Sequence, residues 1–393
     1  MYYGWYEWQR GGFAPWLRLA RRAAAAGGDR WLRAGVELLA RNGAAGEPVR
    51  ADLAGYVGRE YGRPVLVRTV AATPFYTLRV FGARRAANRP RVLLVAPFSG
   101  YATSMLAEFV AALLPAAECL VIDWTDARLV PKAAGPFDLD AQTLAVLEVL
   151  RAHGPGLHVV AVSQGVVPAL AAVALVAADD LAPRSLSLLG GPVDPRRNPT
   201  ALDRTLALIP PSLLEAQLLS VVPPRFPGRG RRVYPGVLQL LTYALNNAGL
   251  DLRAQAGLLA ELVAGRPDGY ARLHAELHAV ADVPGELFAQ GLRTVYRDAA
   301  LPRGAWAVHG REVEPGRIAA RTALLTVEAG RDELVGRGQT HAAHDLRPAP
   351  PSRSRRARLT LDGAGHVDLF KGPMFQARLV PRLLRFIAAA DAA

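Results

Sequence analysis

Short apolar runs, each bounded by Gly, Pro or Asp, recur along the chain and have the character of β-strands. They are rich in Val, Ile and Leu and do not alternate regularly between polar and apolar residues, which is typical of parallel strands buried on both faces. Helical stretches such as Asp140–His153 and Val166–Ala178 separate them. This alternation predicts an α/β fold with a doubly wound, mostly parallel sheet. The predicted strands are Arg91–Ala96, Cys119–Asp123, Leu157–Val162, Ser185–Leu189, Ala323–Glu328 and Arg358–Leu361.

The middle of the chain follows a different pattern. From about Arg196 to Pro315 the strand signals fade, and Leu-rich helical segments such as Leu250–Gly265 and Tyr270–Val280 replace them. Because the strand pattern resumes after Arg321, we interpret the middle as a helical lid inserted over the carboxyl edge of the sheet. The predicted regions are an N-terminal aromatic and helical segment (1–60), the first part of the core (61–195), the lid (196–320) and the second part of the core (321–393).

Composition limits the class of protein. With 393 residues, of which 51% are apolar and 21% charged, the chain has an ordinary globular composition. Its net charge of +13 raises the question of a nucleic-acid partner. Only Lys132 and Lys371 are lysines, however, and the arginines are dispersed without a zinc-finger or RNP-like motif. We therefore attribute the charge to genomic base composition and expect no nucleic acid as a partner.

Cysteine usage and the N-terminal sequence indicate the compartment. Cys119 is the only cysteine, so the chain has no intrachain disulfide, which fits a reducing cytoplasm. The N-terminal sequence lacks the apolar segment of a secretory signal. The longest apolar run, Val166–Ala178, falls short of the roughly 18 residues that span a bilayer. We expect a cytoplasmic protein without a membrane span.

The sharpest chemical signal follows the predicted strand Leu157–Val162. Ser163 comes directly after this strand and opens into an apolar helix. In the nucleophile elbow of the α/β-hydrolase fold, the serine occupies a strained strand-to-helix turn, so the residues two before and two after it must be small. Ala161 and Gly165 meet this requirement. The sequence therefore predicts the α/β-hydrolase fold with Ser163 as nucleophile.

A serine nucleophile needs a base and an acid that orients the base. In this fold the chain order is Ser, then Asp or Glu, then His. Asp332 lies just past one predicted strand, and His366 lies in a Gly-rich loop past the last one. We predict that His366 deprotonates Ser163 and then protonates the leaving group, while Asp332 fixes the imidazole tautomer. The alternatives to Asp332 as the acid are Asp345, Glu333 and Glu328.

Two backbone N–H groups are expected to stabilise the oxyanion that forms on acyl attack. The first is that of Gln164, which follows the nucleophile at the start of the helix. The second comes from the loop after an early central strand, here Ala96–Gly100. We predict Phe98 or Ser99 as this second donor.

The remaining polar clusters are weaker candidates. His274 and His278 lie four residues apart on a predicted helix, but Glu276 does not complete the H-E-x-x-H zinc motif, so we interpret them as an exposed helix face. We predict neither a metal nor a cofactor. His341, His344 and Asp345 are considered as metal ligands, and Asp123 and Asp126 as residues that hold loop structure. Gly228–Gly230 is not a phosphate-binding loop, because it follows no strand.

With these residues in view, the chain resembles the intracellular poly(3-hydroxybutyrate) depolymerase family, from its N-terminus to nearly its end. Two of the matching stretches, Val222–Gly236 and Gly338–Leu346, are long and unusual. The resemblance implies hydrolysis of a polyester store in cytoplasmic granules, with release of 3-hydroxybutyrate and short oligomers, and hence the polyhydroxyalkanoate granule surface as partner. The matching stretches are Ala96–Gly100, Asp123–Pro131, Gly190–Asp194, Val222–Gly236 and Gly338–Leu346.

The elbow departs from the pattern of that family. Many of its members carry cysteine followed by Gln-Pro, whereas this chain has Ser163 followed by Gln164 and Gly165. Serine hydrolyses esters equally well, so the reaction class is preserved. The related polymer synthases need a cysteine at the elbow, and Cys119 lies on a different predicted strand, which argues against a synthase.

The N-terminus is unusually aromatic, with seven of the 28 aromatic residues among the first 16. They either pack on the hydrolase body or at a homodimer interface, or they anchor the protein on the granule. Two other functions stay open: a serine esterase or lipase acting on small or lipid esters, and a non-catalytic granule-surface protein, against which the ordered Ser, Asp and His argue. The N-terminal aromatic residues are Tyr2, Tyr3, Trp5, Tyr6, Trp8, Phe13 and Trp16.

Overall fold

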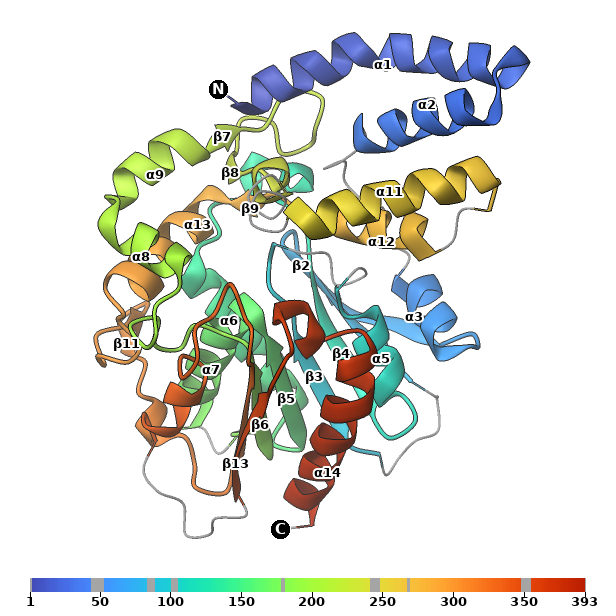
Figure 1. Cartoon of the computed structure of the whole chain (residues 1–393). Helices are drawn as coiled ribbons and strands as arrows, with labels where there is room; N and C mark the ends of the chain where they lie inside the picture. Colours follow the sequence, from blue (N-terminus) through green and yellow to red (C-terminus); the bar gives the residue numbers. More distant parts are fainter. Residues whose placement is uncertain are drawn as a thin grey trace.

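A sheet of eight strands forms the centre of the computed structural model, in the order β1-β2-β4-β3-β5-β6-β12-β13 (Figure 1). The structure describes residues 2–43, 53–82, 89–99, 105–177, 181–240, 248–266, 269–347 and 355–392. Of the positions discussed above, Gly100 and Ala178 lie outside these ranges. The structure describes the backbone but not the side chains of residues 2–11 and of Glu276.

The sheet is mostly parallel, as predicted. Only β2 runs against its neighbours β1 and β4, and every other adjacent pair is parallel. Together with the serine turn that follows β5, this is the α/β-hydrolase fold. The strands are β1 (Val67–Ala72), β2 (Tyr76–Phe81), β3 (Arg91–Val95), β4 (Glu118–Trp124), β5 (Leu157–Val162), β6 (Ser185–Leu189), β12 (Ala323–Ala329) and β13 (Arg356–Leu361).

Helices cover both faces of this sheet. On one face α6 packs along α7, and on the other α5 packs against α3 and α14. Every residue of α7 is buried, which explains why its sequence is apolar all round. We call the sheet and these helices the hydrolase body. The helices are α3 (Leu53–Tyr61), α5 (Ala107–Leu113), α6 (Leu139–His153), α7 (Val166–Val176) and α14 (Val380–Asp391).

Between β6 and β12 the chain leaves the sheet for a helix-rich insertion, residues 190–322 (Figure 1). Its two small sheets, β7-β8-β9 and β10-β11, are separate from the central one. Its elements are α8 (Ala201–Leu208), α9 (Pro211–Leu218), β7 (Ser220–Val221), β8 (Arg232–Tyr234), α11 (Ala248–Ala264), α12 (Gly269–His278), β9 (Val283–Pro284), α13 (Gly285–Gly291), the π-helix η5 (Leu292–Arg297), β10 (Ala307–Val308) and β11 (Arg311–Glu312).

The N-terminal helices join the insertion rather than the sheet. Helix α2 (Arg30–Gly43) packs between α1 (Tyr2–Gly27) and α11, and α11 packs on α12. Asn42 bonds to Gln255 and His274, which fixes this packing by hydrogen bonds. We call α1, α2, α11 and α12 the outer helical layer; Figure 1 shows it at the top of the molecule. No helix in the described part of the chain is both long and apolar enough to span a membrane.

Candidate active site

Ser163 occupies the turn between β5 and α7 in a left-handed backbone conformation, with φ at 53°. Such a conformation is costly for a residue with a side chain and persists only where the surroundings impose it. Gly165 is required in this turn, because a Cβ there would lie 2.6 Å from the Val95 carbonyl oxygen. Close packing of the turn on β3 therefore holds Ser163 in its strained position.

Ser163, His366 and Asp332 form a continuous chain of hydrogen bonds. His366 Nδ1 lies 2.8 Å from Asp332 Oδ2, and His366 Nε2 lies 2.9 Å from Ser163 Oγ. Since a carboxylate only accepts, Nδ1 carries the proton and Nε2 is free to accept from the serine hydroxyl. The imidazole is almost fully buried. The arrangement can therefore remove a proton from Ser163 and deliver it to a leaving group.

The loops that carry Asp332 and His366 are joined to each other. The Arg331 amide donates to the Ala364 carbonyl over 2.8 Å, one residue before Asp332 and two before His366. The second carboxylate oxygen of Asp332 accepts from the amides of Leu334 and Val335, each at 2.9 Å. One carboxylate oxygen is thus used to shape its own loop, which aims the other at the histidine.

The alternatives to Asp332 point elsewhere. The Asp345 carboxylate pairs with Arg197 at 2.7 Å and Arg358 at 3.0 Å, at the exposed side of β13. Glu328 is buried and accepts from two backbone amides of the loop after Asp332. Glu333 makes no hydrogen bond to His366 among the described contacts. Asp332 is the acid that the geometry brings to the imidazole.

The predicted oxyanion donors lie on neighbouring turns. Val95 of β3 pairs with Ala161 of β5, so the chain leaves both strands side by side, into Phe98 and Ser99 on one and Gln164 on the other. The Ser99 carbonyl accepts from the Ala281 amide at 3.2 Å, which ties this turn to the insertion. Gln164 lies in the first helical turn, Ser163–Gly165, and the N–H groups of a first turn have no partner within the helix. Which N–H meets the oxyanion stays a prediction.

The histidine pair of the outer helical layer differs from its prediction. His274 is 4% exposed rather than on an open helix face, and its ring stacks on that of His278 at 3.9 Å. Its Nε2 lies 2.7 Å from Asn42 Oδ1 of α2, a partner that the local sequence could not reveal. Burial lowers the pKa of His274 to about 4. His274 therefore joins α12 to α2.

The other clusters are also structural. His341 and His344 both bond to the Thr326 hydroxyl, at 2.6 and 2.9 Å. Asp126 is buried and pairs with Arg128 at 2.7 Å, inside the loop where a structural function was predicted. Across the described ranges, no group of three or more His, Cys, Asp or Glu side chains could hold a metal ion.

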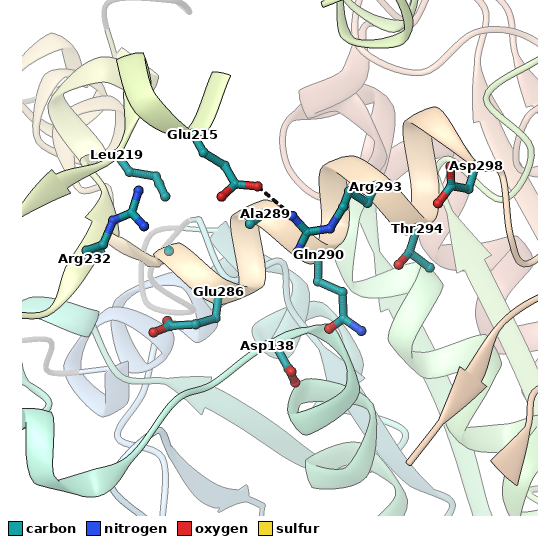
Figure 2. Close-up of a pocket in the computed structure, with 11 residues that line it drawn as sticks. Asp138, Glu215, Leu219, Arg232, Glu286, Ala289, Gln290, Arg293, Thr294 and Asp298 are labelled. Atoms are coloured by element: carbon teal, nitrogen blue, oxygen red, sulfur yellow. Dashed lines mark hydrogen bonds and ion pairs between the residues drawn. The ribbon is translucent and has the colours of Figure 1, made fainter. Parts of the chain in front are cut away.

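A polar cavity of about 600 Å³ lies between α9, α13 and β8 of the insertion and the amino end of α6 in the hydrolase body (Figure 2). Arg293 reaches across it from η5 to Glu215 of α9, with 2.6 Å between the charged atoms. Neither Ser163 nor His366 lines it. The lining residues are Asp138, Glu215, Leu219, Arg232, Gly285, Glu286, Ala289, Gln290, Arg293, Thr294 and Asp298.

The chain was also compared with known proteins. The family model described as PHB de-polymerase C-terminus matches residues 190–391. An enol-lactonase from Burkholderia xenovorans is 15% identical, with a TM-score of 0.47 over 80% of this chain and 97% of that one. A monoacylglycerol lipase from Paleococcus ferrophilus is 11% identical, with a TM-score of 0.46 over 80% and 99%. The α/β hydrolase GrgF from a Penicillium species is 14% identical, with a TM-score of 0.46 over 84% and 100%. No curated protein matches the chain.

Proposed function

Because the chain belongs to the PHB depolymerase family, whose model matches residues 190–391, we propose that it hydrolyses poly(3-hydroxybutyrate)-type polyesters. The products are 3-hydroxybutyrate and short oligomers. The family and the α/β-hydrolase fold make the protein an ester hydrolase. We further propose that the ester is this polymer and that Ser163, His366 and Asp332 catalyse its hydrolysis.

In the proposed mechanism, Ser163 Oγ attacks the ester carbonyl carbon while His366 Nε2 takes the hydroxyl proton. The oxyanion of the tetrahedral intermediate accepts from the N–H of Gln164 and of Phe98 or Ser99. The intermediate collapses, the C–O bond breaks, and His366 returns the proton to the alcohol end of the departing chain. Water then attacks the acyl-serine with the same histidine as base, which frees the acid end.

The observation that carries this proposal is the unbroken hydrogen-bond chain from Ser163 through His366 to Asp332. It begins at a serine whose strained φ of 53° is the mark of a nucleophile elbow. A fold kept only as a scaffold would have no reason to retain this strain together with a buried, correctly oriented base.

The proposed partner is the surface of the polyester granule in the cytoplasm, met by the outer helical layer. Large apolar side chains stay exposed on α1 and α2, where a soluble monomer would normally bury them. Trp16 is 71% exposed and Trp31 57% exposed. Aromatic rings on amphipathic helices favour an apolar–water boundary. The exposed set on the two helices is Phe13, Trp16, Leu19, Trp31, Leu32 and Leu39.

The test is release of 3-hydroxybutyrate from amorphous polymer granules by the wild type and by Ser163→Ala, with a soluble short-chain aryl ester measured in parallel. We expect both reactions to fall by about 10⁴–10⁶ in kcat in the variant. If the wild type cleaves the aryl ester through Ser163 but leaves granules intact, the substrate is a small or lipid ester instead. Unchanged hydrolysis in the variant would remove Ser163 as nucleophile.

A further inference from the structure

The turn after β6 touches both the nucleophile and the base. A Cβ on Gly190 would lie 3.4 Å from His366 Cε1, and one on Gly191 would lie 2.7 Å from the Ser163 carbonyl oxygen. Gly190 has a φ of 56°, and the imidazole ring of His366 lies next to its Cα. A displacement of this turn would therefore move the serine and the imidazole relative to each other.

One buried hydroxyl fixes this turn. Thr340 Oγ1 accepts from the Gly191 amide at 3.0 Å and donates to the Gly191 carbonyl at 2.9 Å. Its side chain is fully buried. The Gly191 carbonyl also accepts from the Val193 amide at 2.9 Å, whereas Thr340 Oγ1 is the partner of the Gly191 amide among the described contacts. Loss of the Thr340 hydroxyl would therefore leave this buried amide without a partner, which is costly.

Thr340 is itself held by the strand that leads to Asp332. The Glu328 carboxylate, near the end of β12, accepts from the Gly338 amide at 2.8 Å and the His341 amide at 2.9 Å. These two amides bracket Thr340 along the chain. The loop that carries Asp332 is thereby closed on its own strand, and its far end delivers the Thr340 hydroxyl to the Gly191 turn.

We propose that Thr340 is a positioning residue, whose hydroxyl locks the Gly190–Gly191 turn so that Ser163 and His366 keep their hydrogen-bond geometry. The inference rests on the proposed function of these two residues. It gives a function to one residue of the stretch Gly338–Leu346, which the hydrolysis mechanism itself does not use. Since Thr340 acts through the Gly191 turn, its loss reduces the rate of serine attack more than substrate binding.

The chain contains a matched control for this bond. Thr322, just before the amino end of β12, is also buried, and its hydroxyl donates to the Pro183 carbonyl at 2.8 Å. Thr322→Val therefore removes a buried threonine–carbonyl bond at the edge of the sheet opposite the active site. Thr340→Val removes a similar buried hydroxyl beside the active site, and Thr340→Ser keeps that hydroxyl.

The experiment measures the rate of labelling by a fluorophosphonate, which reads the reactivity of Ser163 whatever the natural substrate is, together with kcat and KM for a soluble aryl ester. A misplaced catalytic group can cost up to about 100-fold. We expect Thr340→Val to slow labelling and kcat per labelled site by about 10- to 100-fold with KM within about twofold. Thr340→Ser is expected to restore the rate, and Thr322→Val to keep it.

Two results would overturn the proposal in distinguishable ways. If Thr340→Val is labelled as fast as the wild type, Thr340 is not a positioning residue. The same holds if Thr340→Val loses no more labelling rate than Thr322→Val and the two variants have similar unfolding midpoints. In either case Ser163 remains the nucleophile. Labelling that persists in Ser163→Ala removes the nucleophile, and with it the inference.

Discussion

The hydrolase body and the outer helical layer differ in how far their large apolar side chains are exposed to solvent. In the body, α7 and the central strands are buried almost completely, and the proposed catalytic residue Ser163 lies where β5 meets α7. In the outer helical layer, Phe13, Trp16 and Trp31 face solvent. Burial of apolar surface stabilises the body, whereas the layer leaves large apolar side chains exposed, and we propose that these contact the polyester granule.

The comparison predicts first that chemistry belongs to the body alone. Replacing His366 with Gln removes the base, and we expect kcat for a soluble ester to fall by about 10⁴–10⁶ while the unfolding midpoint stays close to that of the wild type. Steady-state kinetics and urea unfolding measure the two effects. A kcat within tenfold of the wild type would place the base elsewhere.

The second expected effect is on stability. Leu93 is fully buried on β3, whereas Leu39 on α2 is exposed. Leu93→Ala should therefore cost about 2–5 kcal/mol of unfolding free energy because it leaves a cavity, and Leu39→Ala less than about 0.5 kcal/mol. Urea titrations followed by circular dichroism test this. Equal losses would mean that Leu39 is covered in solution, for example by a second copy of the chain.

The third expected effect is on binding to the polymer. Each large apolar side chain that is fully buried contributes about 1.5–3 kcal/mol, so Trp16→Ser with Trp31→Ser should weaken sedimentation with amorphous granules by at least about tenfold. Hydrolysis of a soluble ester should not change. Val70→Ser is the control, because Val70 is an exposed apolar residue on β1 of the body.

Two outcomes would contradict granule binding by the layer. Val70→Ser could weaken sedimentation as much as the double tryptophan variant, which would indicate unspecific adhesion. Alternatively, light scattering could show that the wild type is a dimer and the double variant a monomer, which would assign the exposed rings to self-association.

The smallest expected effect is the response to pH. Burial lowers the pKa of His274 in the layer and of His344 in the body to about 4, from a usual value of 6.5. The unfolded chain therefore takes up protons first, and stability falls as pH drops from about 6.5 towards 4. Hydrogen exchange at pH 6.5 and pH 4 should show faster opening of both α12 and β12 at the lower pH, and His274→Gln should reduce this change in α12 but not in β12. An unchanged pH response of α12 in His274→Gln would contradict the assignment to His274.

The sequence predicted the body better than the layer for a physical reason. Each of the six strands predicted is present within two residues of its expected ends, because strands buried on both faces must be apolar throughout. The edge strand β1 was missed because most of its residues are exposed. Strand β2 was missed because partly buried polar residues, Thr77 and Arg79, interrupt its apolar run. The N-terminal helix α1 forms despite Pro15 and its glycines, which the local pattern marks as breakers.

The candidate site shows the same limit. Ser163, Asp332 and His366 could be proposed from chain order, because each follows a predicted strand at the same edge of the sheet. The bond from Thr340 to Gly191 could not be, since the two residues lie 149 positions apart and a threonine in a loop carries no local signal. His274 was misplaced for the same reason, because its partner Asn42 is 232 positions away.

The docking of α2 on α11 also has a consequence for how the protein is made. Asn42 and its partner Gln255 are 213 residues apart, and the ribosome makes the first long before the second. At about 5–20 residues per second, α1 and α2 wait roughly 10–40 s for the helix they pack against. During this interval the tryptophans of α1 and α2 are outside the exit tunnel without the helix that α2 packs against, and chaperones are expected to bind the nascent chain there.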